Sequence, residues 1–270
     1  MIARAPAKLN LALVVGPLRP DGKHELVTIF QRVDLADRID VEPASDTTIK
    51  GFPADTLVRR ALETLAAPHG WRVHIEKRVP VAAGLGGGSS DAAAALQLAN
   101  AQLDDPFEPN ELHELAARLG SDVPFFLREG PQLGTGDGST LEPIDLPQDF
   151  AVVLLLPDGA VKASTAAVYE AFDRRGGAEG FTERAELLRT RLAAVRDAVD
   201  LAALPPNDLA SSPLEAEFLK AGAFRAGVSG AGPAVYGLFA ERAAASTAAR
   251  RLRRHGTTWS TVPVRSGAER

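Results

Sequence analysis

The chain carries at residues 80–91 the sequence Pro80-Val81-Ala82-Ala83-Gly84-Leu85-Gly86-Gly87-Gly88-Ser89-Ser90-Asp91. Alternating apolar residues from Trp71 to Val79 predict a strand before this stretch, and an alanine- and leucine-rich segment predicts a helix after it. We expect Ser90 or Asp91 to cap that helix, which continues to about Leu103. Glycines let backbone N–H groups approach a ligand, and a helix N-terminus attracts anions. Residues 80–90 therefore predict a phosphate site, and a flexible strand-to-helix turn is the alternative.

Two common phosphate-binding loops do not match this stretch. A Walker A loop requires Gly-Lys-Ser/Thr, and residues 80–91 contain no lysine. A dinucleotide fingerprint requires Gly-x-Gly-x-x-Gly, and Ser89 stands at the third glycine position. A dinucleotide oxidoreductase is therefore disfavoured.

Further strands and helices follow from the hydrophobic pattern on either side of the glycine stretch. Strands are predicted at 9–14, 26–35, 38–42, 71–79, 150–156 and 257–264, with a strand–turn–strand unit over 223–239. Helices are predicted at 57–65, 109–119, 183–199 and 243–254, while 43–55 resembles a loop. Because strands and helices mix without strict alternation, the pattern indicates an α+β fold. We place a domain boundary in the proline-containing segment 143–150, which gives domains of 1–147 and 148–270.

Composition narrows the classes of protein. Hydrophobic residues make up 45% and charged residues 24% of the chain, as in an ordinary globular protein. The net charge of −5 disfavours a nucleic-acid partner, and the lack of cysteine excludes disulfides and cysteine nucleophiles. The longest apolar run, Phe150 to Leu156, is much shorter than a membrane span, and the N-terminus lacks a signal peptide. We expect a cytoplasmic protein with no membrane partner.

Three motifs along the chain resemble those of the GHMP small-molecule kinases. They are Pro6-Ala7-Lys8-Leu9-Asn10-Leu11, the glycine stretch and Val228-Ser229-Gly230-Ala231-Gly232. One branch of that superfamily phosphorylates the 2-hydroxyl of a cytidine diphosphate-linked methylerythritol. This chain is similar to that branch in the turn Arg19-Pro20-Asp21-Gly22 with His24-Glu25-Leu26, in the glycine stretch and in Gly120-Ser121-Asp122-Val123-Pro124-Phe125-Phe126. That reaction belongs to the non-mevalonate route to isoprenoid precursors.

The resemblance implies an N-terminal domain like domain 2 of ribosomal protein S5 and a C-terminal ferredoxin-like domain, with the active site between them. It implies an ATP-dependent kinase that uses Mg²⁺ and has no metal site of its own. It also implies a small-molecule substrate and a monomer or weak homodimer.

Asp122 and Lys8 are the expected catalytic residues. Asp122 on its own could be a turn aspartate, and Lys8 could be an edge-strand lysine that points to water. The resemblance implies instead that Asp122 accepts the proton of the acceptor hydroxyl and that Lys8 pairs with it. Lys8 would then also stabilise charge on the reacting oxygens.

Substrate contacts are assigned by the same resemblance. His24 would read the cytosine edge, Asn10 would hold the erythritol end, and Thr165 and Tyr169 would line the pocket, with Tyr169 stacked on the base. Ser229 and Gly230 of the last glycine motif would also contact substrate. As bare sequence features, His24 could be a solvated loop histidine, Tyr169 a core aromatic residue and residues 227–233 a hairpin turn.

This chain departs from the family pattern at three places, one of which is Ala231 with Pro233 in the last glycine motif. It has Lys23 where the family usually has a tyrosine, so one aromatic partner of the base is replaced by a cation that could meet the diphosphate. It has Asp55-Thr56-Leu57 where Asp-Asn-Leu is usual near the adenine. Another GHMP kinase, acting on homoserine, mevalonate or a sugar, and a non-catalytic nucleotide-binding module remain as alternatives.

Overall fold

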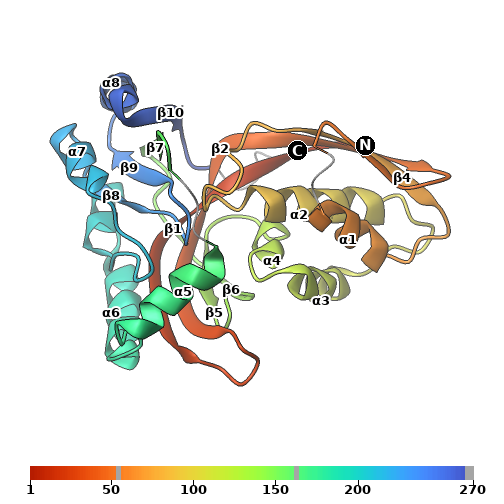
Figure 1. Cartoon of the computed structure of the whole chain (residues 1–270), viewed down its shortest axis with the longest axis horizontal. Helices are drawn as coiled ribbons and strands as arrows, with labels where there is room; N and C mark the ends of the chain where they lie inside the picture. Colours follow the sequence, from red (N-terminus) through yellow and green to blue (C-terminus); the bar gives the residue numbers. More distant parts are fainter. Residues whose placement is uncertain (53–55, 161–163, 265–270) are drawn as a thin grey trace.

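Two β-sheets with helices around them form the protein (Figure 1). The computed structural model describes residues 1–52, 56–160 and 164–264. Its strands are β1 (Ile2–Leu18), β2 (His24–Ala44), β3 (Thr48–Lys50), β4 (Gly70–Glu76), β5 (Gln132–Thr135), β6 (Thr140–Pro143), β7 (Ala151–Pro157), β8 (Arg225–Val228), β9 (Val235–Phe239) and β10 (Gly256–Thr261). Its α-helices are α1 (Thr56–Thr64), α2 (Gly87–Asn100), α3 (Pro109–Leu119), α4 (Val123–Phe126), α5 (Thr165–Arg174), α6 (Phe181–Ala194), α7 (Leu214–Lys220) and α8 (Arg242–Leu252). Short 3₁₀ helices are η1 (Ala198–Ala203) and η2 (Arg253–His255).

The first sheet has the strand order β3-β4-β2-β5-β6, with β1 paired to β2. Its pairings are antiparallel except for the parallel pair of β3 and β4. The second sheet has the order β10-β7-β9-β8 and is antiparallel throughout. This mixture of helices with largely antiparallel sheets confirms the predicted α+β class.

The long ribbon of β1 and β2 corrects the prediction of two separate strands over 26–35 and 38–42. A register shift pairs Pro6 with Ala36 and Ala7 with Val33, so Asp34 and Leu35 form a bulge. A bulge reverses the alternation of apolar side chains without ending a strand, which makes one strand resemble two in the sequence. The bulge also bends the ribbon, whose two long strands run through the molecule in Figure 1.

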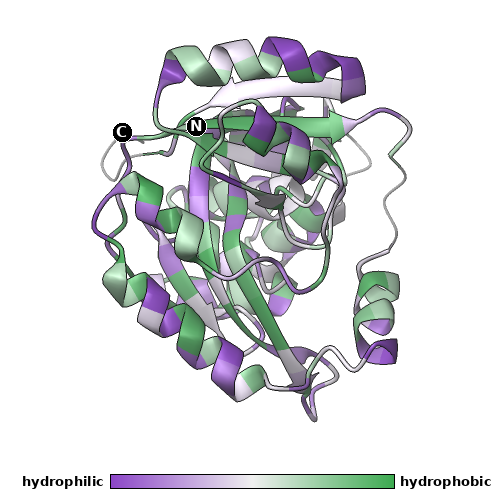
Figure 2. Cartoon of the chain, turned by 90° about the vertical axis from the view of Figure 1, so that its left-hand side faces the viewer, coloured by the Kyte–Doolittle hydropathy of each residue, from purple (hydrophilic) through white to green (hydrophobic). Residues whose placement is uncertain are grey.

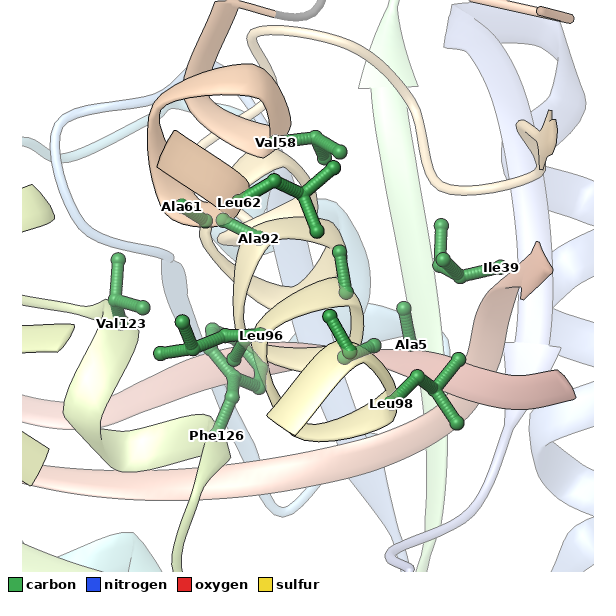
Figure 3. Packing of buried hydrophobic residues seen from close by; sticks show 14 of the residues in the cluster. Ala5, Ile39, Val58, Ala61, Leu62, Ala92, Leu96, Leu98, Val123 and Phe126 are labelled. Atoms are coloured by element: carbon green, nitrogen blue, oxygen red, sulfur yellow. The ribbon is translucent and has the colours of Figure 1, made fainter. Parts of the chain in front are cut away.

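Helix α2 forms the centre of the first core. It packs against β1 and β2 on one side and against α1 and α4 on the other. Its alanines, from Ala92 to Ala95, are buried, and their small side chains let the neighbouring elements approach closely. Figure 3 shows side chains of α1, α2, α4 and the two long strands gathered around this helix. This tight packing fixes the position of the N-terminus of α2, which is formed by the end of the glycine stretch.

The second sheet is covered by α7 and α8. Figure 2 shows the side of the molecule with these helices, which carry hydrophilic and hydrophobic residues in turn along their length, as amphipathic surface helices do. The buried Arg225 on β8 links the sheets, because its guanidinium donates to the carbonyl of Leu11 at 2.5 Å and to those of Leu201 and Leu204. Within the described residues, no helix is long and apolar enough to cross a bilayer.

Several element boundaries differ from the prediction. Strand β4 ends at Glu76 rather than Val79, because the amides of Arg78 and Val79 donate to the buried Asp37 carboxylate instead of a strand partner. Helix α6 covers 181–194 rather than 183–199, and β3 lies within the predicted loop of 43–55. Helices α4, α5 and α7 and strands β5 and β6 were not predicted. The two sheets are built from residues 2–143 and 151–261, and the domain boundary between 147 and 148 stays a proposal.

Candidate active site

A cavity of about 810 Å³ is lined by parts of the chain that are distant in sequence. Its walls are the strand β1, the start of β2, the glycine stretch 80–89, the turn before α4, the helix α5 and residues 230–232. Of the predicted site residues, the wall includes Lys8, Asn10, His24, Pro80 to Ser89, Asp122, Thr165, Tyr169 and Gly230. Folding therefore brings all of the predicted site residues except Ser90 and Ser229 to the wall of this cavity.

Backbone contacts between two glycine segments shape one wall of the cavity. Gly84 has a φ of +84°, and a Cβ on it would lie 2.3 Å from the carbonyl oxygen of Ser229. A Cβ on Gly232 would lie 2.2 Å from the carbonyl of Ala83. The amide of Ala234 donates to the carbonyl of Ala83 at 3.1 Å. These positions need glycine because two backbones touch there, so the second glycine cluster supports the first rather than forming only a hairpin turn.

The N-terminus of α2 meets the cavity without a capping side chain. The N-cap is Gly86, with a φ of 70° in the left-handed region, and no side chain caps the helix. This corrects the prediction of a cap at Ser90 or Asp91, which lie inside the helix. Gly87, Gly88 and Ser89 form the first turn, whose backbone N–H groups lack the usual helical acceptor. The open helix terminus is suited to an anion, and a phosphate site here stays a prediction.

Lys8 and Asp122 lie side by side in the cavity. Lys8 Nζ is 3.3 Å from Asp122 Oδ2, and the two side chains are 4% and 36% exposed, respectively. Lys8 is therefore buried against the wall, whereas the Asp122 carboxylate is accessible from the cavity. The pairing expected from the resemblance is present in the structure.

Neighbouring groups fix the position of the Lys8 ammonium. It donates to Asn10 Oδ1 at 2.5 Å and lies 5.4 Å from the centre of the Phe30 ring. Asn10 in turn donates to Thr28 Oγ1 at 2.8 Å, which fixes the orientation of its amide. On the opposite side, a Cβ on Gly86 would lie 2.9 Å from Lys8 Cγ, so the helix terminus and the lysine are in direct contact. Lys8 thus connects the anion site with Asp122.

Another part of the cavity wall is aromatic. The ring of His24 stacks on that of Tyr169 with centroids 4.8 Å apart, and Phe172 meets the histidine edge-on at 5.9 Å. His24 Nε2 lies 2.8 Å from Asp173 Oδ1. Burial, together with the nearby Asp122 charge, raises the pKa of Tyr169 to about 12. Thr165 opens α5, the helix that also carries Tyr169 and Phe172, so α5 and the start of β2 with His24 form this wall together.

Two predicted residues are placed differently. Ser229 is fully buried behind the wall, where its hydroxyl donates to the carbonyl of Gly84 at 3.1 Å and accepts from the amide of Asn10 at 3.3 Å. Ser90 is buried within α2, and its hydroxyl has no partner among the described residues. Both side chains therefore lie outside the cavity wall, and contact of these two residues with a ligand stays a prediction. Asp55, expected near the adenine, is outside the described residues.

Sequence reasoning missed a buried charge cluster beside the glycine stretch. Lys77 Nζ lies 2.5 Å from Asp37 Oδ2 and 2.6 Å from Asp91 Oδ2, and both carboxylates are buried. Burial and the Asp37 charge raise the pKa of Asp91 to about 8, against the opposing effect of Lys77. Burial lowers the pKa of Lys77, but the two carboxylates outweigh it and raise that pKa above its usual value. Because the members lie 40 and 14 residues apart, no local motif indicated the cluster.

Comparisons with known proteins now decide the family. The profile of the GHMP kinases N terminal domain matches residues 56–130, and that of the GHMP kinases C terminal domain matches residues 185–258. A 4-diphosphocytidyl-2-C-methyl-D-erythritol kinase from Rhodococcus jostii is 40% identical, with 99% of this chain and 92% of the relative covered. One of the same name from Streptomyces coelicolor is 39% identical, with 94% of this chain and 92% of the relative covered. The chain belongs to the 4-diphosphocytidyl-2-C-methyl-D-erythritol kinase family of GHMP kinases.

Solved structures agree with this assignment. A crystal structure of 4-(cytidine 5'-diphospho)-2C-methyl-D-erythritol kinase is 33% identical and superposes with a TM-score of 0.78, covering 97% of this chain and 99% of that one. A mevalonate kinase structure has a TM-score of 0.75 at 13% identity, covering 98% and 100%, which shows the shared fold alone. The family kinase described here is thus an ATP-dependent enzyme that phosphorylates a small molecule.

Proposed function

We propose that this kinase transfers the γ-phosphoryl group of ATP to the 2-hydroxyl of 4-diphosphocytidyl-2-C-methyl-D-erythritol, a step toward isoprenoid precursors. One observation carries the proposal. The pair of Lys8 and Asp122, 3.3 Å apart, lies in a cavity between an open helix N-terminus and an aromatic wall. That order of subsites suits a triphosphate on one side and a nucleotide-linked alcohol on the other.

Asp122 is the proposed base. Its carboxylate faces the cavity, so it can accept the proton that the hydroxyl loses as the new P–O bond forms. Lys8 keeps that carboxylate oriented through their contact, and its positive charge stabilises the negative charge that develops on the transferring oxygens. Asn10 holds the Lys8 ammonium and lies where it can also contact the polyol.

The glycine stretch is the proposed site of the nucleotide phosphates. The backbone N–H groups at the start of α2 and the positive end of its dipole favour bound phosphate oxygens. Residues 80–89 line the cavity, and we propose that they contact the nucleotide. Gly88 leaves open space where a Cβ would stand, so a phosphate can approach its backbone closely.

Mg²⁺ is the proposed counter-ion of the phosphates. In phosphoryl-transfer enzymes this ion keeps several waters and binds one or two protein oxygens together with the phosphates. The donor set on the wall fits that use: Asp122 offers a carboxylate and Ser89 a hydroxyl next to the helix terminus. When bound, the ion would neutralise phosphate charge, while Lys8 and Asp122 hold the reacting hydroxyl.

The base end of the substrate is proposed to lie against α5. His24, Tyr169 and Thr165 surround this end of the cavity, with aromatic faces suited to a pyrimidine and polar atoms suited to its edge. Gly230 closes the wall nearby through its backbone, whose carbonyl accepts from Asn207 at 2.7 Å.

A coupled assay of ADP release tests this proposal. The purified protein is given ATP, Mg²⁺ and, in separate reactions, 4-diphosphocytidyl-2-C-methyl-D-erythritol, mevalonate, homoserine and galactose. We expect turnover with the first acceptor only. Turnover of another alcohol with an inert cytidine substrate would reject the proposed acceptor, and ATP binding without any phosphorylated product would point to a non-catalytic nucleotide-binding module.

A further inference from the structure

Lys23 is a cation on the cavity wall that the proposed reaction does not yet use. It lies at the end of the turn between β1 and β2, and its side chain is 48% exposed. Its Nζ forms an ion pair with Asp137 Oδ2 and lies 3.4 Å from Ser121 Oγ. The turn that carries Lys23 is fixed, because the amide of Leu26 donates to the carbonyl of Gly136 at 2.8 Å. The ammonium is therefore directed toward residues 121 and 137.

The position of this ammonium is defined by its neighbours in the chain and in space. Lys23 directly precedes His24, which belongs to the aromatic end of the cavity. Its Nζ reaches Ser121, which directly precedes the proposed base Asp122. The Lys23 ammonium therefore lies beside the segments that carry His24, at the proposed base subsite, and Asp122, at the proposed hydroxyl subsite.

In the proposed substrate, a diphosphate joins the base to the alcohol. We infer that Lys23 binds the diphosphate that joins cytidine to the polyol and so determines which acceptors the enzyme accepts. This inference rests on the proposed function, since it takes the cytidine end to lie at His24 and the hydroxyl at Asp122. A cation here favours a substrate with two linking phosphates over one whose base and alcohol are joined without charge.

Other cations of the cavity are already engaged. Lys8 contacts Asp122 and Asn10, while Lys77 lies between two buried carboxylates. An ammonium has three N–H donors, and Lys23 uses one of them on Asp137 and at most a second on the more distant Ser121. Among the described residues, Lys23 is the most exposed of the lysines that line the cavity, at 48% against 4% for Lys8 and 15% for Lys77.

Asp137 forms an ion pair with Lys23 but leaves the Lys23 ammonium accessible to a ligand. The Asp137 carboxylate is 12% exposed and also accepts from Ser121 Oγ at 3.0 Å, Ser139 Oγ at 2.6 Å and the Ser139 amide at 3.1 Å. Burial raises its pKa, but these hydrogen bonds and the one from Lys23 outweigh it and hold the pKa well below the usual range. The carboxylate is therefore ionised at neutral pH and is satisfied by its donors, while the lysine remains accessible.

Binding of cytidine and cytidine diphosphate tests the inference apart from turnover. Both compounds are titrated by calorimetry into the wild type and into Lys23→Ala and Lys23→Arg. We expect Lys23→Ala to weaken cytidine diphosphate about tenfold, as for one lost charge-assisted hydrogen bond, and to change cytidine by less than about twofold. Lys23→Arg should retain most of the affinity, because it keeps the charge. Equal losses for both compounds, or no loss for either, would overturn the inference.

Asp137→Asn distinguishes diphosphate binding by Lys23 from a purely structural contact between the turn and residue 137. If Lys23 only ties the turn to residue 137, removing either partner has the same effect, and Asp137→Asn weakens cytidine diphosphate as Lys23→Ala does. If Lys23 binds the diphosphate, Asp137→Asn leaves the ammonium less restrained and the affinity equal to or higher than in the wild type. A parallel loss in both variants contradicts the inference.

Steady-state kinetics complete the test. With the intact acceptor, Lys23→Ala should raise the acceptor KM about tenfold, leave the ATP KM within about twofold, and make the acceptor KM less sensitive to salt than in the wild type. A wild type that is inactive on this acceptor would reject the proposed function instead. A wild type that is active, with an unchanged acceptor KM in Lys23→Ala, would reject only the role of Lys23.

Discussion

Two lysine–carboxylate clusters flank the glycine stretch, and they differ in what surrounds the charges. Lys8 contacts one carboxylate, Asp122, which is 36% exposed toward the cavity. Lys77 contacts two carboxylates, Asp37 and Asp91, whose side chains have no exposed surface. The same residue types therefore form an accessible pair on one side and an enclosed triad on the other.

This difference in exposure indicates that the two clusters have different roles, one in the reaction and one in stability. An accessible carboxylate can exchange a proton with a substrate, whereas an enclosed carboxylate has no contact with one. A buried carboxylate that accepts backbone amides, as Asp37 does from Val79 at 2.8 Å, holds the chain leading into the glycine stretch. We expect the first cluster to govern turnover and the second to govern stability.

Removing the accessible charges should give the largest effect. Asp122→Asn and Lys8→Met are each expected to lower kcat by about 10³-fold, in the range for loss of a general base or of charge stabilisation. The unfolding free energy of Asp122→Asn should stay within about 1 kcal/mol of the wild type, because the side chain is partly exposed. ADP release and urea unfolding measure the two quantities. Near-normal turnover in both variants would exclude the pair from catalysis.

Breaking the enclosed triad should chiefly lower stability. Asp37→Ala is expected to reduce the unfolding free energy by about 3–5 kcal/mol, because two backbone amides lose their buried acceptor and Lys77 loses one of its two carboxylates. Urea denaturation followed by circular dichroism measures the change. A loss below about 1 kcal/mol would show that the triad is no more important to stability than an exposed pair.

The pH dependence of stability should reveal the second buried carboxylate. The pKa of Asp91 is raised from 3.8 to about 8 in the folded protein, so the native state holds a proton that the unfolded chain releases. Its contribution is complete below about pH 4 and is lost as the pH rises through about 8. Asp91→Asn should therefore flatten the fall in unfolding free energy between pH 5 and about 8. An unchanged slope would mean that another group titrates there.

An exposed ion pair should give the smallest change in unfolding free energy. Arg4 and Asp34 form a salt bridge with side chains 59% and 45% exposed. Asp34→Ala should change the unfolding free energy by about 0–1 kcal/mol, because water and salt screen this pair. The same urea measurement serves as the matched control for Asp37→Ala. A loss as large as that of Asp37→Ala would show that burial does not distinguish the two pairs.

Local patterns predicted much of the fold. Helix α3 was predicted with its observed bounds of 109–119, since its apolar spacing and its following glycine are local signals. Helix α2 was predicted, but its start was not, because a left-handed glycine N-cap has no side-chain signal. Helix α5 was missed as an element although Tyr169 within it was singled out. The bulge in β2 resembles a break between two strands in the sequence, because the alternation of apolar side chains does not distinguish a bulge from a break.

The sequence alone determined the α+β class, because that class follows from the hydrophobic pattern along the whole chain. Residues 80–90 stay a predicted phosphate site, and the pairing of Lys8 with Asp122 was expected only from the resemblance to GHMP kinases. Tertiary structure alone decided which groups face the cavity. It turned Ser90 and Ser229 away, enclosed Lys77 with Asp37 and Asp91, and set Lys23 beside Asp137. Burial and charge pairing depend on chain segments up to 114 residues apart, and no local pattern of side chains records those distances.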